Sequence, residues 1–299
     1  MGDVIMETSF QKIANRVSVI TIIGNVILSL FKFMAGIIAH SNAMISDAIH
    51  SASDVFSTFV VMAGIKFASK EPDKEHPYGH ERLECVTAII LAMILFMTGL
   101  WIGVDAITCI CMSNYHETEI TGILALVAAI ISIVSKEAMY WYTRYYAKKI
   151  DSDALMADAW HHRSDAFSSI GALIGIIGTR LGFPIMDAIA SLVISLFITK
   201  AAVDIFRDAM DKMIDHSCDD ETEAQIRTCV MENQDVIDIK LLKTRIFGNK
   251  IYVDVEILAD ASSTLKEAHF IARNVHNKIE ETFPKVKHIM VYVSPATHE

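Results

Sequence analysis

Two segments of the sequence contain the same arrangement of histidine and aspartate. Residues 45–58 and 156–169 are identical at seven of fourteen positions, and both contain the pattern Asp-x-x-His-x-x-x-Asp. Imidazole nitrogens and carboxylate oxygens together suit a tetrahedral zinc ion, which they bind at ~2.0–2.2 Å. The same donors accept cobalt, nickel, iron or copper, whereas calcium and magnesium prefer oxygen ligands alone. The repeated pattern therefore indicates binding of a divalent transition-metal ion.

The spacing within each segment places the donors together. The histidine and the second aspartate are four residues apart, so on a helix they lie on one face, one turn apart. If the two helices pack against each other, two imidazoles and two carboxylates converge. The predicted ligands are His50, Asp54, His161 and Asp165. On a helix His162 points about 100° away from His161, which favours a structural role for it.

Long apolar runs hold these segments. The chain has 299 residues, of which 53% are hydrophobic, and its mean hydropathy is +0.38. A helix of ~20 apolar residues crosses the ~30 Å hydrocarbon core of a bilayer. We predict an α-helical membrane protein with six transmembrane helices, at residues 14–39, 43–69, 81–111, 118–147, 152–180 and 185–209. The polar N-terminal sequence lacks the apolar core of a signal peptide, so the first span is expected to be retained.

Basic residues gather at one end of the predicted spans. Lys and Arg occur before the first span, between the second and third, and after the fourth, whereas the connections at the other end contain only Arg180. Positive residues stay on the cytoplasmic side. We therefore expect both termini in the cytoplasm, and a multi-pass protein of the inner or plasma membrane.

The second and fifth spans, which hold the repeated segments, then run in opposite directions. Inverted repeats that place polar groups near the bilayer midplane are typical of secondary transporters. Ionisable residues at that depth each cost at least ~2.5 kcal/mol on insertion scales, which argues against mere helix pairing. Asp47 and Asp158 lie one turn before the histidines, toward the outside and the cytoplasm respectively. Two interpretations remain open for them: entrance carboxylates of a metal path, or groups hydrogen-bonded near the ends of polar cavities.

The remainder of the chain has the pattern of a small acidic domain. We predict a transmembrane domain over residues 1–211 and a cytoplasmic α/β domain over 212–299, in the order helix, strand, strand, helix, strand. Two segments in which the residues alternate as in strands flank the hairpin turn FGNK. Thr264 is well placed to cap the second helix. The net charge of −10 and the absence of a basic footprint predict no nucleic-acid partner.

Taken together, the six spans, the His-x-x-x-Asp pairs and the short α/β tail resemble the cation diffusion facilitator family over nearly the whole chain. A further resemblance is the segment PDKEHPYGHERLE at 72–84. It implies a loop metal site at Asp73, His76 and His80, and an interhelix ion pair between Arg82 and Asp211.

The tail resembles the metallochaperone-like dimerisation domain of the same family. This resemblance implies a homodimer and a weaker tail site at Asp254 and His269, with His288 as a further candidate. The sequence departs from the family pattern at Lys240 and Tyr292, where histidine is usual.

The expected function is efflux of a divalent transition-metal ion, with Zn²⁺ favoured because both helices offer histidine; Fe²⁺, Co²⁺, Cd²⁺ and Mn²⁺ are the alternatives. Free imidazole titrates near ~6.5, so protons compete with metal for the same nitrogens and can serve as counter-ions in an antiport. The chain is accordingly expected to be a secondary active transporter in the lipid bilayer rather than an enzyme. The rival interpretations are a membrane metal-dependent enzyme and a metal sensor.

Overall fold

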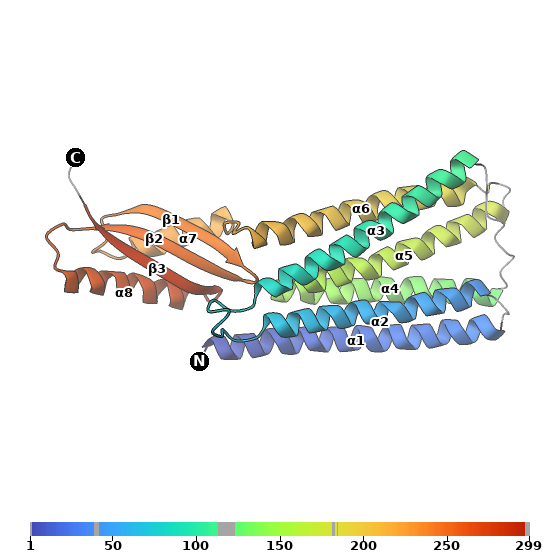
Figure 1. Cartoon of the computed structure of the whole chain (residues 1–299), viewed down its shortest axis with the longest axis horizontal. Coiled ribbons are helices and arrows are strands. Elements are labelled where there is room, and N and C mark those ends of the chain that lie inside the picture. The colour runs from blue at the N-terminus through green and yellow to red at the C-terminus, as the bar shows by residue number, and fades with distance from the viewer. Residues whose placement is uncertain (1, 39–41, 113–122, 181–182, 184, 297–299) are drawn as a thin grey trace. The chain divides into compact units, whose positions relative to one another are not determined.

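The computed structural model describes residues 2–38, 42–112, 123–180, 183 and 185–296. The chain forms two compact units, residues 1–210 and 211–299. In the first unit the described residues form the six long helices expected from the sequence (Figure 1). They are α1 (Gly2–Ile38), α2 (Asn42–Ala68), α3 (Arg82–Met112), α4 (Ile123–Ile150), α5 (Asp153–Arg180) and α6 (Ile185–Met213). The six-helix part of the predicted fold class is thus confirmed.

The start of α1 differs from the expectation. The helix begins at Gly2 rather than at residue 14. The segment before residue 14 is polar but has no proline and no internal glycine, so nothing in it ends a helix. The apolar run marks the part of α1 that is expected to cross the membrane, and the helix begins before that part.

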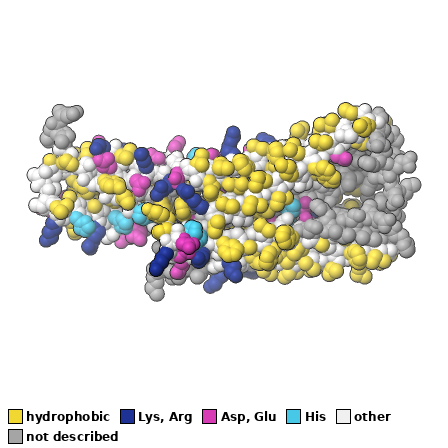
Figure 2. All heavy atoms as spheres, viewed as in Figure 1, with side chains coloured by type: hydrophobic (Ala, Val, Ile, Leu, Met, Phe, Trp, Pro, Cys, Tyr) yellow, Lys and Arg dark blue, Asp and Glu magenta, His cyan; other side chains and the backbone are white. Residues whose placement is uncertain are grey.

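The outer surface of the helical unit is strongly apolar. Stretches long and apolar enough to cross a membrane are Phe10–Ala35, Arg82–Met112 and Ala188–Met213. Large hydrophobic side chains such as Ile27, Trp101 and Phe197 are exposed, and Figure 2 shows hydrophobic side chains over much of the visible face of the helical unit. A soluble monomer rarely exposes contiguous apolar surface of this extent.

Small residues allow the helices to approach closely. A Cβ atom added at Gly64 of α2 would lie 2.1 Å from Thr87 Oγ1 of α3. On α3, Gly99 and Gly103 similarly face Thr199 and Ser195 of α6. These contacts place α3 beside α2 and α6, as Figure 1 shows.

The second unit has the predicted order of elements. It consists of α7 (Asp220–Met231), β1 (Asp238–Phe247), β2 (Lys250–Ala259), α8 (Leu265–Thr282) and β3 (Val286–Pro295). The sheet order is β1-β2-β3, with β1 antiparallel and β3 parallel to β2. Gly248 takes a φ of 62° in the hairpin turn, a conformation that glycine adopts without steric cost.

The core of this unit lies between the helices and one face of the sheet. Val253, Val255 and Ile257 of β2 pack in one cluster with Ile271 and Val275 of α8. At the start of α8 the Thr264 side chain accepts a hydrogen bond from the backbone of Glu267, whose carboxylate accepts from Thr264 in return. This capping box fixes where the helix begins. The αββαβ part of the predicted fold class is confirmed.

Candidate metal centre

Three of the four predicted ligands of the membrane site converge between α2 and α5. Asp54, His161 and Asp165 each offer one ligand atom, and these atoms all lie within 4.8 Å of one another. His161 Nε2 is 3.4 Å from Asp54 Oδ1, and Asp54 is buried. The fourth predicted ligand, His50, has a side chain outside the described residues.

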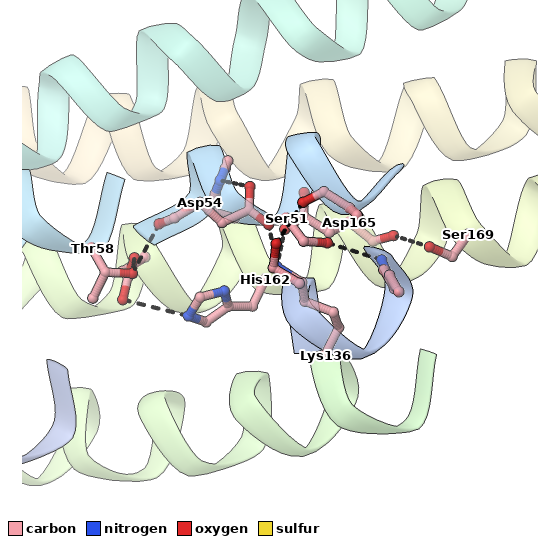
Figure 3. Close-up of polar contacts among 12 residues, drawn as sticks. Ser51, Asp54, Thr58, Lys136, His162, Asp165 and Ser169 are labelled. Atoms are coloured by element: carbon pink, nitrogen blue, oxygen red, sulfur yellow. Dashed lines mark hydrogen bonds and ion pairs between the residues drawn. The ribbon is translucent and has the colours of Figure 1, made fainter. Parts of the chain in front are cut away.

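A lysine that the sequence reasoning missed joins this cluster. Lys136 of α4 is only 1% exposed. Its ammonium donates hydrogen bonds to Asp54 Oδ2 and, over 2.9 Å, to Asp165 Oδ2 (Figure 3). A signal for it was present, because Lys136 lies well inside the fourth apolar span, and an ionisable residue at membrane depth usually serves a function. The sequence reasoning considered basic residues only near the ends of the spans.

A second buried polar group lies near the first. Thr58 of α2 donates a 3.2 Å hydrogen bond to Asp158 Oδ1 of α5, and His162 Nε2 is 3.6 Å from Asp158 Oδ2. Asp158 and His162 are completely buried. The role of Asp158 as an entrance carboxylate stays a prediction, as does that of Asp47, whose side chain lies outside the described residues. His162 contacts Asp158 and is not part of the Asp54 cluster.

Two further cations lie along the repeated segments, of which Lys32 is buried and Arg163 is partly exposed. Lys32 of α1 donates a 2.9 Å hydrogen bond to Ser51 of α2, and both residues are buried. Arg163 of α5 donates to the hydroxyl of Tyr140 over 2.7 Å, and its guanidinium lies 4.3 Å from that ring. Arg163 also forms an ion pair with Glu137 of α4, with the two groups 3.8 Å apart, and Lys136 contacts two of the candidate metal ligands.

The loop between α2 and α3 holds a second cluster of candidate metal ligands among the described residues, and the loop site stays a prediction. Asp73, His76 and His80 offer atoms within 4.8 Å of one another. Asp73 Oδ1 is 3.4 Å from His76 Nδ1, and Asp73 Oδ2 is 3.5 Å from His80 Nε2. His80 Nδ1 lies 3.3 Å from the carbonyl oxygen of Lys70. When Nδ1 carries the proton and donates it to this carbonyl, Nε2 is left with a lone pair toward Asp73, a typical outer-shell arrangement for a metal-binding histidine.

The charge of Asp73 is stabilised by its neighbours. Lys70 donates to Asp73 Oδ2 over 2.6 Å, and the backbone N–H groups of Glu75 and His76 donate to Oδ1. These bonds, that of Lys70 first, hold the pKa of Asp73 well below its usual value. The carboxylate is therefore available to a cation throughout the physiological pH range.

The predicted tail ligands do not lie on one surface. Asp254 alternates with Val253 and Val255 along β2, so it lies on the sheet face opposite α8. His269 is exposed on α8. Among the described side chains, neither belongs to a cluster of three or more metal ligands. Lys240 donates to Glu256 over 2.8 Å, and His288 lies beside the Tyr252 ring. The tail site stays a prediction.

The predicted ion pair between Arg82 and Asp211 joins residues of the two compact units. It also stays a prediction.

Both units match known domains. Residues 18–214 match the cation efflux transmembrane domain, and residues 218–296 match the cytoplasmic domain of cation efflux proteins. The chain belongs to the cation diffusion facilitator family. It is 32% identical over 301 residues to the manganese efflux system protein MneP of Bacillus subtilis (strain 168), and the match covers 98% of this chain and 100% of that protein.

Other members of the family come from distant organisms. An uncharacterised transporter of Methanocaldococcus jannaschii is 36% identical over 262 residues, or 88% of this chain and 92% of that protein. The magnetosome protein MamB of Magnetospira sp. (strain QH-2) is 29% identical over 271 residues, or 91% and 92%. Cation efflux proteins are transporters, so this chain is an integral membrane transporter for divalent metal cations rather than an enzyme.

Proposed function

We propose that this protein exports Zn²⁺ from the cytoplasm in exchange for protons, through a site formed by Asp54, His161 and Asp165 together with His50. The observation that carries the proposal is the convergence of the first three residues, from two helices, to within 4.8 Å. One imidazole and two carboxylates supply the nitrogen and oxygen donors that zinc accepts. A second imidazole, from His50, would complete four ligands.

The position of the site suits transport by alternating access. The ligands come from the middle of α2 and α5, whose repeated segments run in opposite directions. Rocking of one half of an inverted repeat against the other exposes a fixed site to each side in turn. Protons arriving from the more acidic side compete for the imidazole nitrogen and favour release of the metal.

The test is zinc flux into liposomes that contain the purified protein. We expect saturable zinc transport with counter-movement of protons, both lost in Asp165→Ala and His50→Ala. Lys148→Met, at the exposed end of α4, is a control that should keep the flux of the unmodified protein. Transport that does not respond to the pH gradient would disprove the antiport, and absence of flux in every version would favour the sensor interpretation.

Manganese is the second candidate, favoured by the 32% identity to a manganese efflux system protein. Zinc prefers four ligands including nitrogen or sulfur, whereas manganese suits carboxylate, carbonyl and water oxygens. Replacing nitrogen by oxygen should therefore separate the two ions. If zinc is the substrate, His161→Asp should lower zinc flux more than manganese flux, measured in the same liposomes. Preferential transport of manganese by the unmodified protein would instead assign that ion.

We also propose that two chains pair through the second unit, with both termini in the cytoplasm. The sheet face opposite α8 exposes the large apolar side chains Leu241, Met290 and Tyr292. Burial of this face against a second copy would remove apolar area from water. Light scattering of the full chain in detergent should give a dimer that Tyr292→Glu weakens. Phe270→Glu, on the exposed side of α8, is the matched control.

A further inference from the structure

We propose that Lys136 is a tethered cation that neutralises the metal site between transport events and must leave its carboxylates when a metal ion binds. The inference rests on the proposed transport function of Asp54 and Asp165. It adds a residue from a third helix, α4, to a site otherwise made by α2 and α5.

The geometry makes lysine and metal mutually exclusive. The ammonium of Lys136 donates to one oxygen of Asp54 and to one oxygen of Asp165, and both aspartates also belong to the ligand cluster. A zinc ion coordinated by these carboxylates would lie ~2.0–2.2 Å from their oxygens. The ammonium would then be close to a divalent ion inside the protein, where repulsion between like charges is strong. Binding of the ion therefore requires the ammonium to move aside.

Because Lys136 is buried, water does not screen its charge. Its side chain is 1% exposed, and that of Asp54 is 2% exposed. Without the lysine, the buried carboxylate of Asp54 and the partly buried carboxylate of Asp165 would lose the ammonium that both contact whenever no metal ion was bound. Unpaired charges at membrane depth are costly. With the lysine in place, the unloaded site keeps a counter-charge while the helices return to receive the next ion.

Two opposing effects of removing the lysine follow. Metal binding no longer has to displace a competing cation, so affinity rises. The unloaded site loses the positive charge of the ammonium, so the return step and hence turnover slow. Removal of a purely structural lysine would not raise the affinity for zinc, and this difference makes the proposal testable.

The first experiment is calorimetric zinc titration of the full chain in detergent. All versions carry His76→Ala and His80→Ala to remove binding at the loop. We expect Lys136→Met to bind zinc at least about tenfold more tightly, with reduced zinc flux in liposomes. Lys136→Arg keeps the positive charge, so this variant should bind zinc as tightly as the parent does. Lys148→Met, the same substitution on the same helix at an exposed position, should change neither quantity. Equal zinc affinity in Lys136→Met and the parent would overturn the proposal.

The second experiment uses the native residue, so it does not depend on folding of a variant. Acetic anhydride would label accessible lysines with and without saturating zinc, and mass spectrometry would quantify acetylation of Lys136. Zinc should increase its labelling several-fold, while that of Lys148 stays constant. Unchanged labelling of Lys136 would overturn the proposal. If Asp165→Ala left zinc binding unchanged, the proposed transport site itself would be disproved.

Discussion

Thr58 on α2 donates a 3.2 Å hydrogen bond to Asp158 on α5, so the two copies of the repeated segment are joined directly. Thr58 is the last residue of the first copy, and Asp158 is the third residue of the second. Both are fully buried. The bond links the two helices that supply the metal ligands.

Replacement of Thr58 by valine should therefore destabilise the helical unit. Valine keeps the shape but removes the donor, which leaves a buried carboxylate oxygen without this partner. The expected loss is ~1–3 kcal/mol, measured as a lower thermal unfolding midpoint of the detergent-solubilised chain. Thr98→Val is the control, because the Thr98 hydroxyl donates an exposed hydrogen bond to the Ile94 carbonyl in its own helix. Equal midpoints for the two variants would contradict the assigned role.

Replacement of Asp54 by asparagine should nearly abolish metal transport. The change removes one of two carboxylate charges and leaves Lys136 with a single carboxylate partner from this pair. Loss of even an outer-shell partner typically costs ~10–100-fold in metal affinity, so loss of a charged ligand should cost at least as much. The measurement is the initial rate of zinc flux in liposomes. Asp235→Asn, in an exposed turn of the second unit, should transport normally; equal loss in both would point to a general defect.

Zinc bound at the loop should be released by mild acid through its histidines and not through Asp73. The pKa of Asp73 is lowered by Lys70 and by backbone N–H groups. A carboxylate with a lowered pKa keeps its charge, and the stability of its contacts, until pH falls through that lowered value. Protons compete for imidazole nitrogen in a higher range, near ~6.5. Zinc titrations between pH 7.5 and 4 should show affinity falling with pH, because protons compete with zinc for imidazole nitrogen, and an affinity that stays constant over this range would contradict release through the histidines.

Replacement of Gly64 by alanine should separate α2 from α3. The new Cβ would lie 2.1 Å from Thr87 Oγ1 and 2.8 Å from Thr87 Cβ, so backbone must move as well as side chain. Overpacking of this kind costs ~1–3 kcal/mol, seen as a lower unfolding midpoint. The double variant Gly64→Ala with Thr87→Ala should recover part of the loss, because two of the three clashing atoms disappear. No recovery would show that the contact is not the cause.

The convergence of Asp54, His161 and Asp165 was predictable because both determinants are local. His161 and Asp165 are four residues apart on one helix, and the repeat marks Asp54 as their counterpart on another. Lys136 was missed because it has no counterpart in the repeated segments. Its part in the site depends on how α4 packs against α2 and α5, and the spacing of residues along one helix contains no information about that packing.

The second unit was predictable for a similar reason, and its tail site was not. Alternation along β1 and β2, the FGNK turn and the Thr264 cap are all short-range signals, and each element forms where they indicate. Whether Asp254 and His269 share a site depends on which face of the sheet α8 covers. Resemblance to a family supplies candidate residues, but the tertiary packing decides their surroundings.

The ligands of the loop are contributed by one short stretch of chain. Asp73, His76 and His80 lie within eight consecutive residues, and Lys70, which contacts both Asp73 and His80, is three residues away. Closing so small a ring costs little chain entropy. A metal ion at the predicted loop site would therefore be held by a self-contained set of ligands, whatever the instantaneous state of the helical bundle.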